Sequence, residues 1–170
     1  MLMMMAAFHI AMLLGAAALL VWAAVGDSLY YRIPNKISVT MLALFPLFIV
    51  TAPHEIDWKQ HLMVFVLILS AGFVMFMGNL AGAGDVKLLA VTGLWAGPHQ
   101  LAVLLAGTAV AGGIVALGMA VLTLIRNRRS TGRNFPALPV AKVPIPYGMA
   151  IAAGGLNILY RLSQPILFPS

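Results

Sequence analysis

Long apolar runs, separated by short polar stretches, make up most of the chain. A membrane-spanning helix needs about 20 apolar residues, because each residue rises 1.5 Å and the hydrocarbon core is roughly 30 Å thick. Four runs fit this pattern, although the second, which contains a proline, and the last are short: residues 2–25, 37–52, 61–80 and 145–160. The pattern therefore predicts an all-α, polytopic membrane protein.

The apolar stretch 88–125 is too long for one crossing. As a single helix it would measure about 57 Å, nearly twice the hydrocarbon thickness. Gly97 and Pro98 offer a natural break. Dividing the stretch there gives a short segment at about 82–97 and a longer one at 99–125, and so about six transmembrane helices in total.

The distribution of Lys and Arg favours six spans over five. With six spans and the N-terminus outside, eight basic residues face the cytoplasm and two face outward, whereas fusing the two segments gives four against six. Basic residues are retained on the cytoplasmic side. In the six-span topology Asp27 and Asp85 share the cytoplasmic face, while Glu55 and Asp57 lie on the opposite one.

Composition supports the membrane assignment and excludes several kinds of site. Of the 170 residues, 62% are hydrophobic and 8% are charged, where a soluble domain carries roughly 25% charged residues. The chain has no cysteine, and its four histidines show no metal-ligand spacing, so we expect no metal or cofactor. Five of the ten basic residues lie in 126–142 without interleaved aromatic residues, which argues for contact with the lipid bilayer and against nucleic acid. We expect one membrane-embedded domain over 1–170.

Asp27 and Asp85 are the candidate catalytic residues. Ionisable groups at the edge of a bilayer are costly and by default suggest function. Asp27 closes the first span, and Asp85 opens the fourth, where a helix N-terminus stabilises an anion. The alternative is structural: Asp85 would cap its helix and Asp27 would be the first solvated side chain.

Two glycines precede Asp85 in the sequence Gly82-Ala83-Gly84-Asp85. Without side chains at Gly82 and Gly84, an extended substrate backbone can come close to the carboxylate. The alternative interpretation is helix packing, because the spacing of Gly78 and Gly82 also suits contacts between membrane helices.

Two neighbouring carboxylates can hydrolyse a peptide bond without a metal or a thiol. They share one proton because both cannot readily ionise at close range. The ionised carboxylate takes a proton from the attacking water, and the protonated one assists the carbonyl oxygen and then the leaving amine. The sequence does not assign these roles, since the dyad titrates as a unit.

Three motifs together resemble the type IV prepilin peptidases, which are intramembrane Gly-x-Gly-Asp aspartic proteases. The stretch from Asp27 to Ile33-Pro34-Asn35 resembles their Asp…Ile-Pro-Asn signature, residues 82–87 their Gly-x-Gly-Asp-x-Lys motif, and Pro146-Tyr147-Gly148 the element before their last helix. The resemblance implies that Asp27 and Asp85 are catalytic. It also implies prepilin or pseudopilin substrates, cut at the cytoplasmic face of the bacterial inner membrane between a short basic leader and a hydrophobic helix.

The chain departs from the longer, bifunctional members of that family. It lacks their cytoplasmic insertion with cysteine pairs after the first span, which argues against N-methylation of the product. Its size is similar to that of the small peptidases of tight-adherence (Flp) pilus systems.

Each supporting residue has a structural interpretation beside the functional one. Pro34 and Asn35 are expected mainly to set the turn into the second span, with Asn35 capping its helix. Lys87 either balances charge near the dyad or extends to the interface. Tyr147 and Gly148 either line the active site or form a loop-to-helix junction.

Other functions explain the same aspartates differently. A small ion- or proton-coupled transporter would use them as ion sites, but we expect such sites near the bilayer midplane and see no internal repeat. A related protease acting on other membrane segments such as preflagellins, or a structural assembly subunit that tolerates Asp substitution, are further alternatives.

Overall fold

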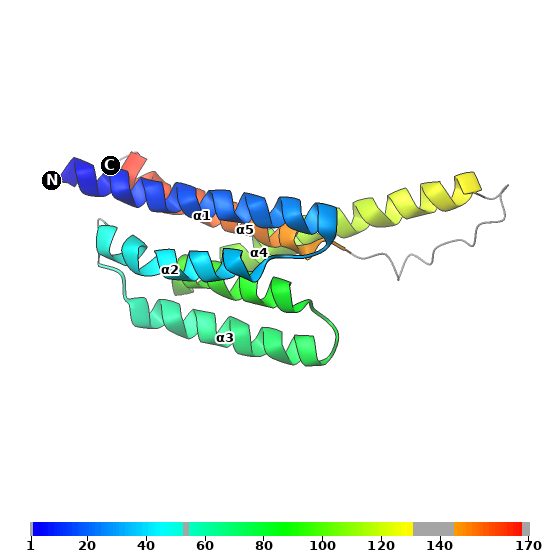
Figure 1. Ribbon diagram of the computed structural model, residues 1–170, viewed down its shortest axis with the longest axis horizontal. Coiled ribbons are helices and arrows are strands. Elements are labelled where there is room, and N and C mark those ends of the chain that lie inside the picture. The colour runs from blue at the N-terminus through cyan, green and yellow to red at the C-terminus, as the bar shows by residue number, and fades with distance from the viewer. Residues whose placement is uncertain (1, 53–54, 131–144, 168–170) are drawn as a thin grey trace.

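Every element of the computed structural model is a helix, within the residues that the structure describes, which are 2–52, 55–130 and 145–167. The prediction of an all-α fold is therefore confirmed for this part of the chain. Figure 1 shows the helices side by side along one common direction. They are α1 (Leu2–Tyr30), α2 (Asn35–Thr51), α3 (Trp58–Met77), α4 (Ala83–Ser130) and α5 (Tyr147–Leu167).

Helix α4 is broken at Gly97, where the backbone has φ 63° and ψ −176°. Figure 1 shows the segment before the break (green) and the segment after it (yellow-green) running in opposite directions. The predicted break at Gly97 and Pro98 is thus confirmed. The conformation at Gly97 is one that essentially only glycine adopts.

His61 of α3 stabilises this break. Pro98 has no N–H, so the carbonyl oxygen of Leu94 loses its usual helical donor four residues on. The imidazole Nδ1 of His61 lies 2.7 Å from that oxygen and takes the place of the missing N–H. The ring lies so close to Gly97 that a Cβ there would be 2.4 Å from it. No pattern in the sequence predicts this role of His61.

By length and composition, three helices within the described residues can cross a membrane: Met4–Tyr30, Trp58–Met77 and Ala83–Arg126. Helix α2 is a shorter apolar helix. The protein is accordingly a membrane protein. The first segment of α4 measures only roughly 22 Å, which is shorter than the hydrocarbon thickness. The number of six crossings therefore stays a prediction.

Some predicted boundaries were wrong by several residues. The first helix continues beyond residue 25 to Tyr30, so Asp27 lies in the last turn of α1 and not after the helix. The last helix continues past residue 160 to Leu167. Much of the predicted basic loop, residues 131–144 with Pro144, lies outside the described residues.

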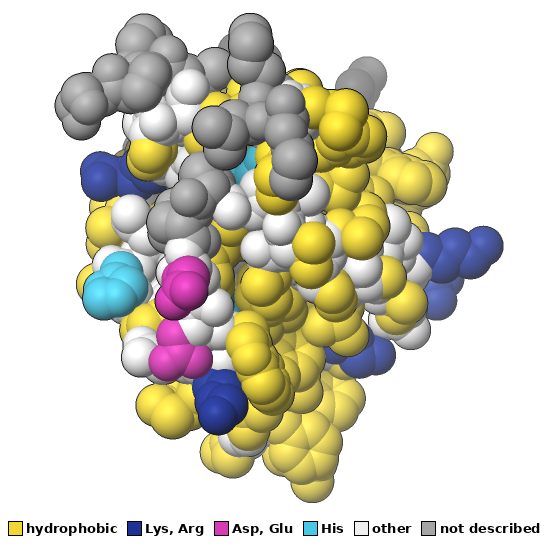
Figure 2. Space-filling view, turned by 90° about the vertical axis from the view of Figure 1, so that its left-hand side faces the viewer, with side chains coloured by type: hydrophobic (Ala, Val, Ile, Leu, Met, Phe, Trp, Pro, Cys, Tyr) yellow, Lys and Arg dark blue, Asp and Glu magenta, His cyan; other side chains and the backbone are white. Residues whose placement is uncertain are grey.

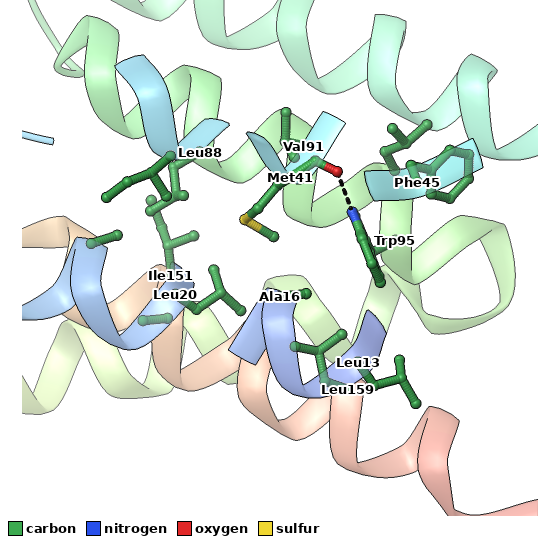
Figure 3. Packing of buried hydrophobic residues seen from close by; sticks show 14 of the residues in the cluster. Leu13, Ala16, Leu20, Met41, Phe45, Leu88, Val91, Trp95, Ile151 and Leu159 are labelled. Atoms are coloured by element: carbon green, nitrogen blue, oxygen red, sulfur yellow. Dashed lines mark hydrogen bonds between the residues drawn. The ribbon is translucent and has the colours of Figure 1, made fainter. Parts of the chain in front are cut away.

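The main core lies between α1, α2, the first segment of α4, and α5 (Figure 3). Its largest side chain, Trp95, is fully buried and donates from Nε1 to the Met41 carbonyl oxygen over 3.1 Å. Helix α3 packs on the outside, where Val64 and Ile68 meet Ala90 of α4. The outer faces of the helices carry exposed hydrophobic side chains, as expected for surfaces in contact with lipid.

Candidate active site at one end of the bundle

Asp27 is buried near the C-terminal end of α1, with 6% of its surface exposed. Its Oδ2 accepts a hydrogen bond of 2.7 Å from the backbone N–H of Gly148, in the first turn of α5. A helix N-terminus supplies unpaired N–H groups and a positive dipole end. The N-terminus of the last helix thus holds the carboxylate of the first.

Asp85 is the third residue of α4 and lies in its first turn. Its carboxylate receives a hydrogen bond from the backbone of Gly82, the residue that precedes the helix. A Cβ at Gly82 would lie 2.7 Å from Oδ2 of Asp85. The absence of a side chain at Gly82 therefore makes room for the carboxylate, which also serves the start of the helix as half of a capping box.

The carboxyl groups of Asp27 and Asp85 lie close enough to each other to interact electrostatically. Ile33, in the connection between α1 and α2, lies beside both flanking glycines. Its side chain is 3.3 Å from the position of a Cβ at Gly84 and 2.9 Å from that at Gly148. Sequence reasoning missed Ile33 as a packing residue of the site, although its place in the Ile-Pro-Asn stretch was a signal.

Gly148 has no space for a side chain. A Cβ there would lie 2.9 Å from both Cβ and Oδ2 of Asp27. The residue is buried, and its role in the structure is to let α5 approach Asp27. Gly84 is less crowded, with its nearest neighbour at 3.3 Å.

Lys87 and Asn35 contact each other near the same end of the bundle. The Lys87 Nζ donates to Oδ1 of Asn35 over 3.2 Å, which joins α4 to α2. The prediction that Asn35 caps its helix was wrong, because Asn35 is itself the first helical residue and Pro34 occupies the cap position without a side-chain hydrogen bond. Lys87 bonds to a neutral amide and its side chain is exposed.

Tyr147 is the first residue of α5 and is about half exposed. Together with Asp85 it lines a cavity of about 210 Å³ between α3, both segments of α4, and α5. Apart from Gly72 and Thr108, apolar side chains form the rest of its wall. Asp85 therefore has both a hydrogen-bonded position and access to an open volume.

The two other acidic residues lie at the opposite end of the bundle, as predicted. Asp57 caps the N-terminus of α3 and accepts hydrogen bonds from the Lys59 backbone N–H and from Gln60. Figure 2 looks onto this end, where two acidic side chains lie close together beside an apolar flank. Asp57 thus has a structural role remote from Asp27 and Asp85.

Two of the histidines, His9 and His61, have structural partners. His9 is buried, lies 3.3 Å from the Thr51 hydroxyl and contacts the Phe48 ring. His61 holds the break in α4. Within the described residues, no three His, Cys, Asp or Glu side chains are grouped so that they can hold a metal ion.

Residues 13–117 match the model of the type IV leader peptidase family. The matched region includes Asp27, Asp85 and Lys87 and ends before Tyr147 and Gly148. Comparisons with curated proteins and with solved structures gave no match.

Proposed function

The chain belongs to the type IV leader peptidase family, and we propose that it is a membrane aspartic endopeptidase that removes the leader from type IV or Flp-like prepilins. The proposed catalytic residues are Asp27 and Asp85. The observation that carries this proposal is their position. Helices α1 and α4 bring the two carboxylates to the N-terminus of α5, where Asp27 is hydrogen-bonded and Asp85 lines a cavity.

The proposed chemistry uses the two carboxylates and one water molecule. The ionised carboxylate accepts a proton from the water molecule while the water oxygen adds to the scissile carbonyl carbon. The protonated carboxylate donates a hydrogen bond to the carbonyl oxygen. When the tetrahedral intermediate collapses, the C–N bond breaks and the amine leaves with a proton from the dyad. A free acid and a free amine result.

The neighbouring glycines support this mechanism by leaving space. Gly82 has no side chain where the Asp85 carboxylate lies, and Gly148 has none where Asp27 meets α5. Because Gly84 has no side chain, the start of α4 can pack closely against Ile33. We assign Lys87, Asn35 and Pro34 to positioning α2 against α4, and Tyr147 to the rim of the cavity.

The proposed active site faces the cytoplasm of a bacterial inner membrane. This orientation rests on the excess of Lys and Arg on that side in a six-span topology. The proposed substrates, prepilins or pseudopilins, present a short basic leader on the same side.

A small ion-coupled transporter is the main alternative. Its acidic residues would be expected near the membrane midplane, at a break between helices. Asp27 and Asp85 instead lie together at one end of the bundle, and neither belongs to the break at Gly97. These positions support the peptidase over the transporter.

Co-expression with a pilin-type precursor tests the proposal. We expect the unaltered protein to shorten the precursor by its leader, and Asp27→Ala and Asp85→Asn variants to leave it intact while still inserting into the membrane. Asp57→Asn is the matched control, because Asp57 is an acidic residue at the other end of the bundle and should be dispensable for cleavage. Normal processing by Asp85→Asn would refute the mechanism.

A further inference from the structure

The cavity beside Asp85 extends away from the carboxylate along the bundle. Along α5 it is bordered first by Tyr147 and then by Ile151, and on the second segment of α4 by Thr108. Thr108 lies against Gly154 of α5. Since Ile151 is four residues beyond Tyr147, the cavity extends roughly 6 Å along α5 from the end of the bundle toward its middle.

The cavity has the size and chemistry of a site for one apolar side chain. Its volume is about 210 Å³, larger than a cavity of about 150 Å³ that accommodates benzene. Beyond Asp85 at one end, its wall is formed by glycine, apolar side chains and Thr108, including Ile68, Gly72 and Leu89. In the part of the cavity away from Asp85, a charged side chain would lose its hydration without finding a charged partner in the wall.

Thr108 contributes to this wall through the size and shape of its side chain, and its hydroxyl takes part in no hydrogen bond within the described residues. Thr92 and Thr123 donate to the carbonyl oxygen four residues earlier in the same helix. The Thr108 hydroxyl is buried and has no hydrogen-bond partner among the described residues. Gly154 approaches so closely that a Cβ there would be 2.4 Å from Oγ1 of Thr108 and 3.0 Å from the Leu104 oxygen.

We propose that this cavity binds the first residue after the scissile bond, the new N-terminal residue of the product, and that Thr108 is a specificity-determining residue that limits the size of its side chain. The inference rests on the proposed function. The leader lies on the cytoplasmic side of the cut and the hydrophobic helix on the membrane side. A cavity that starts at Asp85 and deepens toward the middle of the bundle therefore receives the residue on the membrane side.

The test uses a precursor that the unaltered protein cleaves, in three versions that differ only at the first residue after the cut: Ala, Leu or Phe. The purified full-length protein is reconstituted in vesicles, and kcat/KM is measured for each version. Thr108→Ile narrows the cavity, and we expect it to lower kcat/KM for Phe relative to Ala by about tenfold or more, since one methylene in an apolar pocket changes discrimination by that order. Thr108→Ala enlarges the cavity and should shift the ratio toward Phe.

Thr108→Val is the matched control. It keeps the shape of threonine and removes a hydroxyl that has no partner to lose, so the preference among the three precursors should not change. Ile114→Leu, on an exposed face of the same helix, should also leave it unchanged.

Equal changes for all three precursors in the Ile and Ala variants would overturn the assignment, as would a loss of Phe cleavage in Thr108→Val. Should Thr108→Ile not fold, Thr108→Ala decides alone, because an unchanged Phe-to-Ala ratio contradicts the proposal. If the unaltered protein cleaves no pilin-type precursor at all, the proposed function itself fails, which is a separate result.

Discussion

Gly148 donates a backbone hydrogen bond of 2.7 Å to Oδ2 of Asp27, although 121 positions separate the two residues in the chain. This bond ties the last helix to the first at the end of the bundle where Asp85 also lies. The contact requires a residue without a side chain at 148, because a Cβ would lie 2.9 Å from the carboxylate. The position of Asp27 therefore depends on a glycine outside α1.

Gly148→Ala should reduce cleavage without preventing folding. The added methyl group meets Asp27 and Ile33 at 2.9 Å, so the carboxylate must shift, and displacements of about 1 Å cost on the order of 100-fold in rate. We expect kcat to fall by about tenfold or more. Gly113→Ala, where nothing lies within 4 Å of the new Cβ, is the control. Equal rates for both variants would contradict a positioning role for Gly148.

Gly97→Ala should lower stability. The backbone at Gly97 has a positive φ that costs a residue with a side chain about 1–3 kcal/mol, and the methyl group also meets the His61 ring. The measurement is the apparent Tm of the purified protein in detergent. Gly118→Ala, a helical glycine with open space around it, should leave the Tm unchanged or raise it. An unchanged Tm in Gly97→Ala would contradict the positive-φ conformation of residue 97 and its close contact with His61.

His61→Phe should also lower the apparent Tm. It removes the group that lies 2.7 Å from the Leu94 carbonyl oxygen, and Pro98 has no N–H to replace it. A buried carbonyl left without a partner costs about 1–3 kcal/mol. His99→Phe, at an exposed position next to the same break, is the comparison. Equal losses in the two variants would contradict a specific contribution of the His61 hydrogen bond.

Trp95→Phe tests the connection between α2 and α4. The substitution keeps an aromatic ring in the core but removes the donor to the Met41 carbonyl oxygen. We expect a loss on the order of 1–3 kcal/mol in the free energy of unfolding. The measurement is the apparent Tm in a thermal aggregation assay, which should be lower for this variant. Trp22→Phe, at a residue with 59% exposure on α1, should have little effect by the same assay.

The hydrogen bond between Lys87 and Asn35 should contribute little to the free energy of unfolding. Both side chains are exposed, and exposed polar pairs contribute roughly 0.2–1 kcal/mol. A double-mutant cycle with Lys87→Met and Asn35→Ala, read as kcat/KM, separates this pair from a direct role of Lys87. If the two residues act together, the double variant loses no more activity than Lys87→Met. Additive losses would assign Lys87 a function independent of Asn35.

Several features followed from the sequence alone. The length of the apolar runs predicted an all-helical membrane protein, because a bilayer leaves few other ways to pair backbone groups. The Gly97-Pro98 pair predicted the break in α4, since both residues disrupt helices locally. The positions of the basic residues grouped Asp27 with Asp85 and separated them from Asp57, and the fold brings the first two together.

Other features depended on the tertiary structure, because they join residues that no local pattern connects. The length of α1 beyond residue 25 places Asp27 inside a helix, where contact with α5 buries it. Asn35 bonds to Lys87 and not to its own helix, and His61 supplies the donor that Pro98 lacks. The sequence by itself determined which residues are the candidates for the chemistry and predicted on which side of the membrane they lie. Packing between distant helices decided which backbone group holds the carboxylate of Asp27 and what space opens beside Asp85.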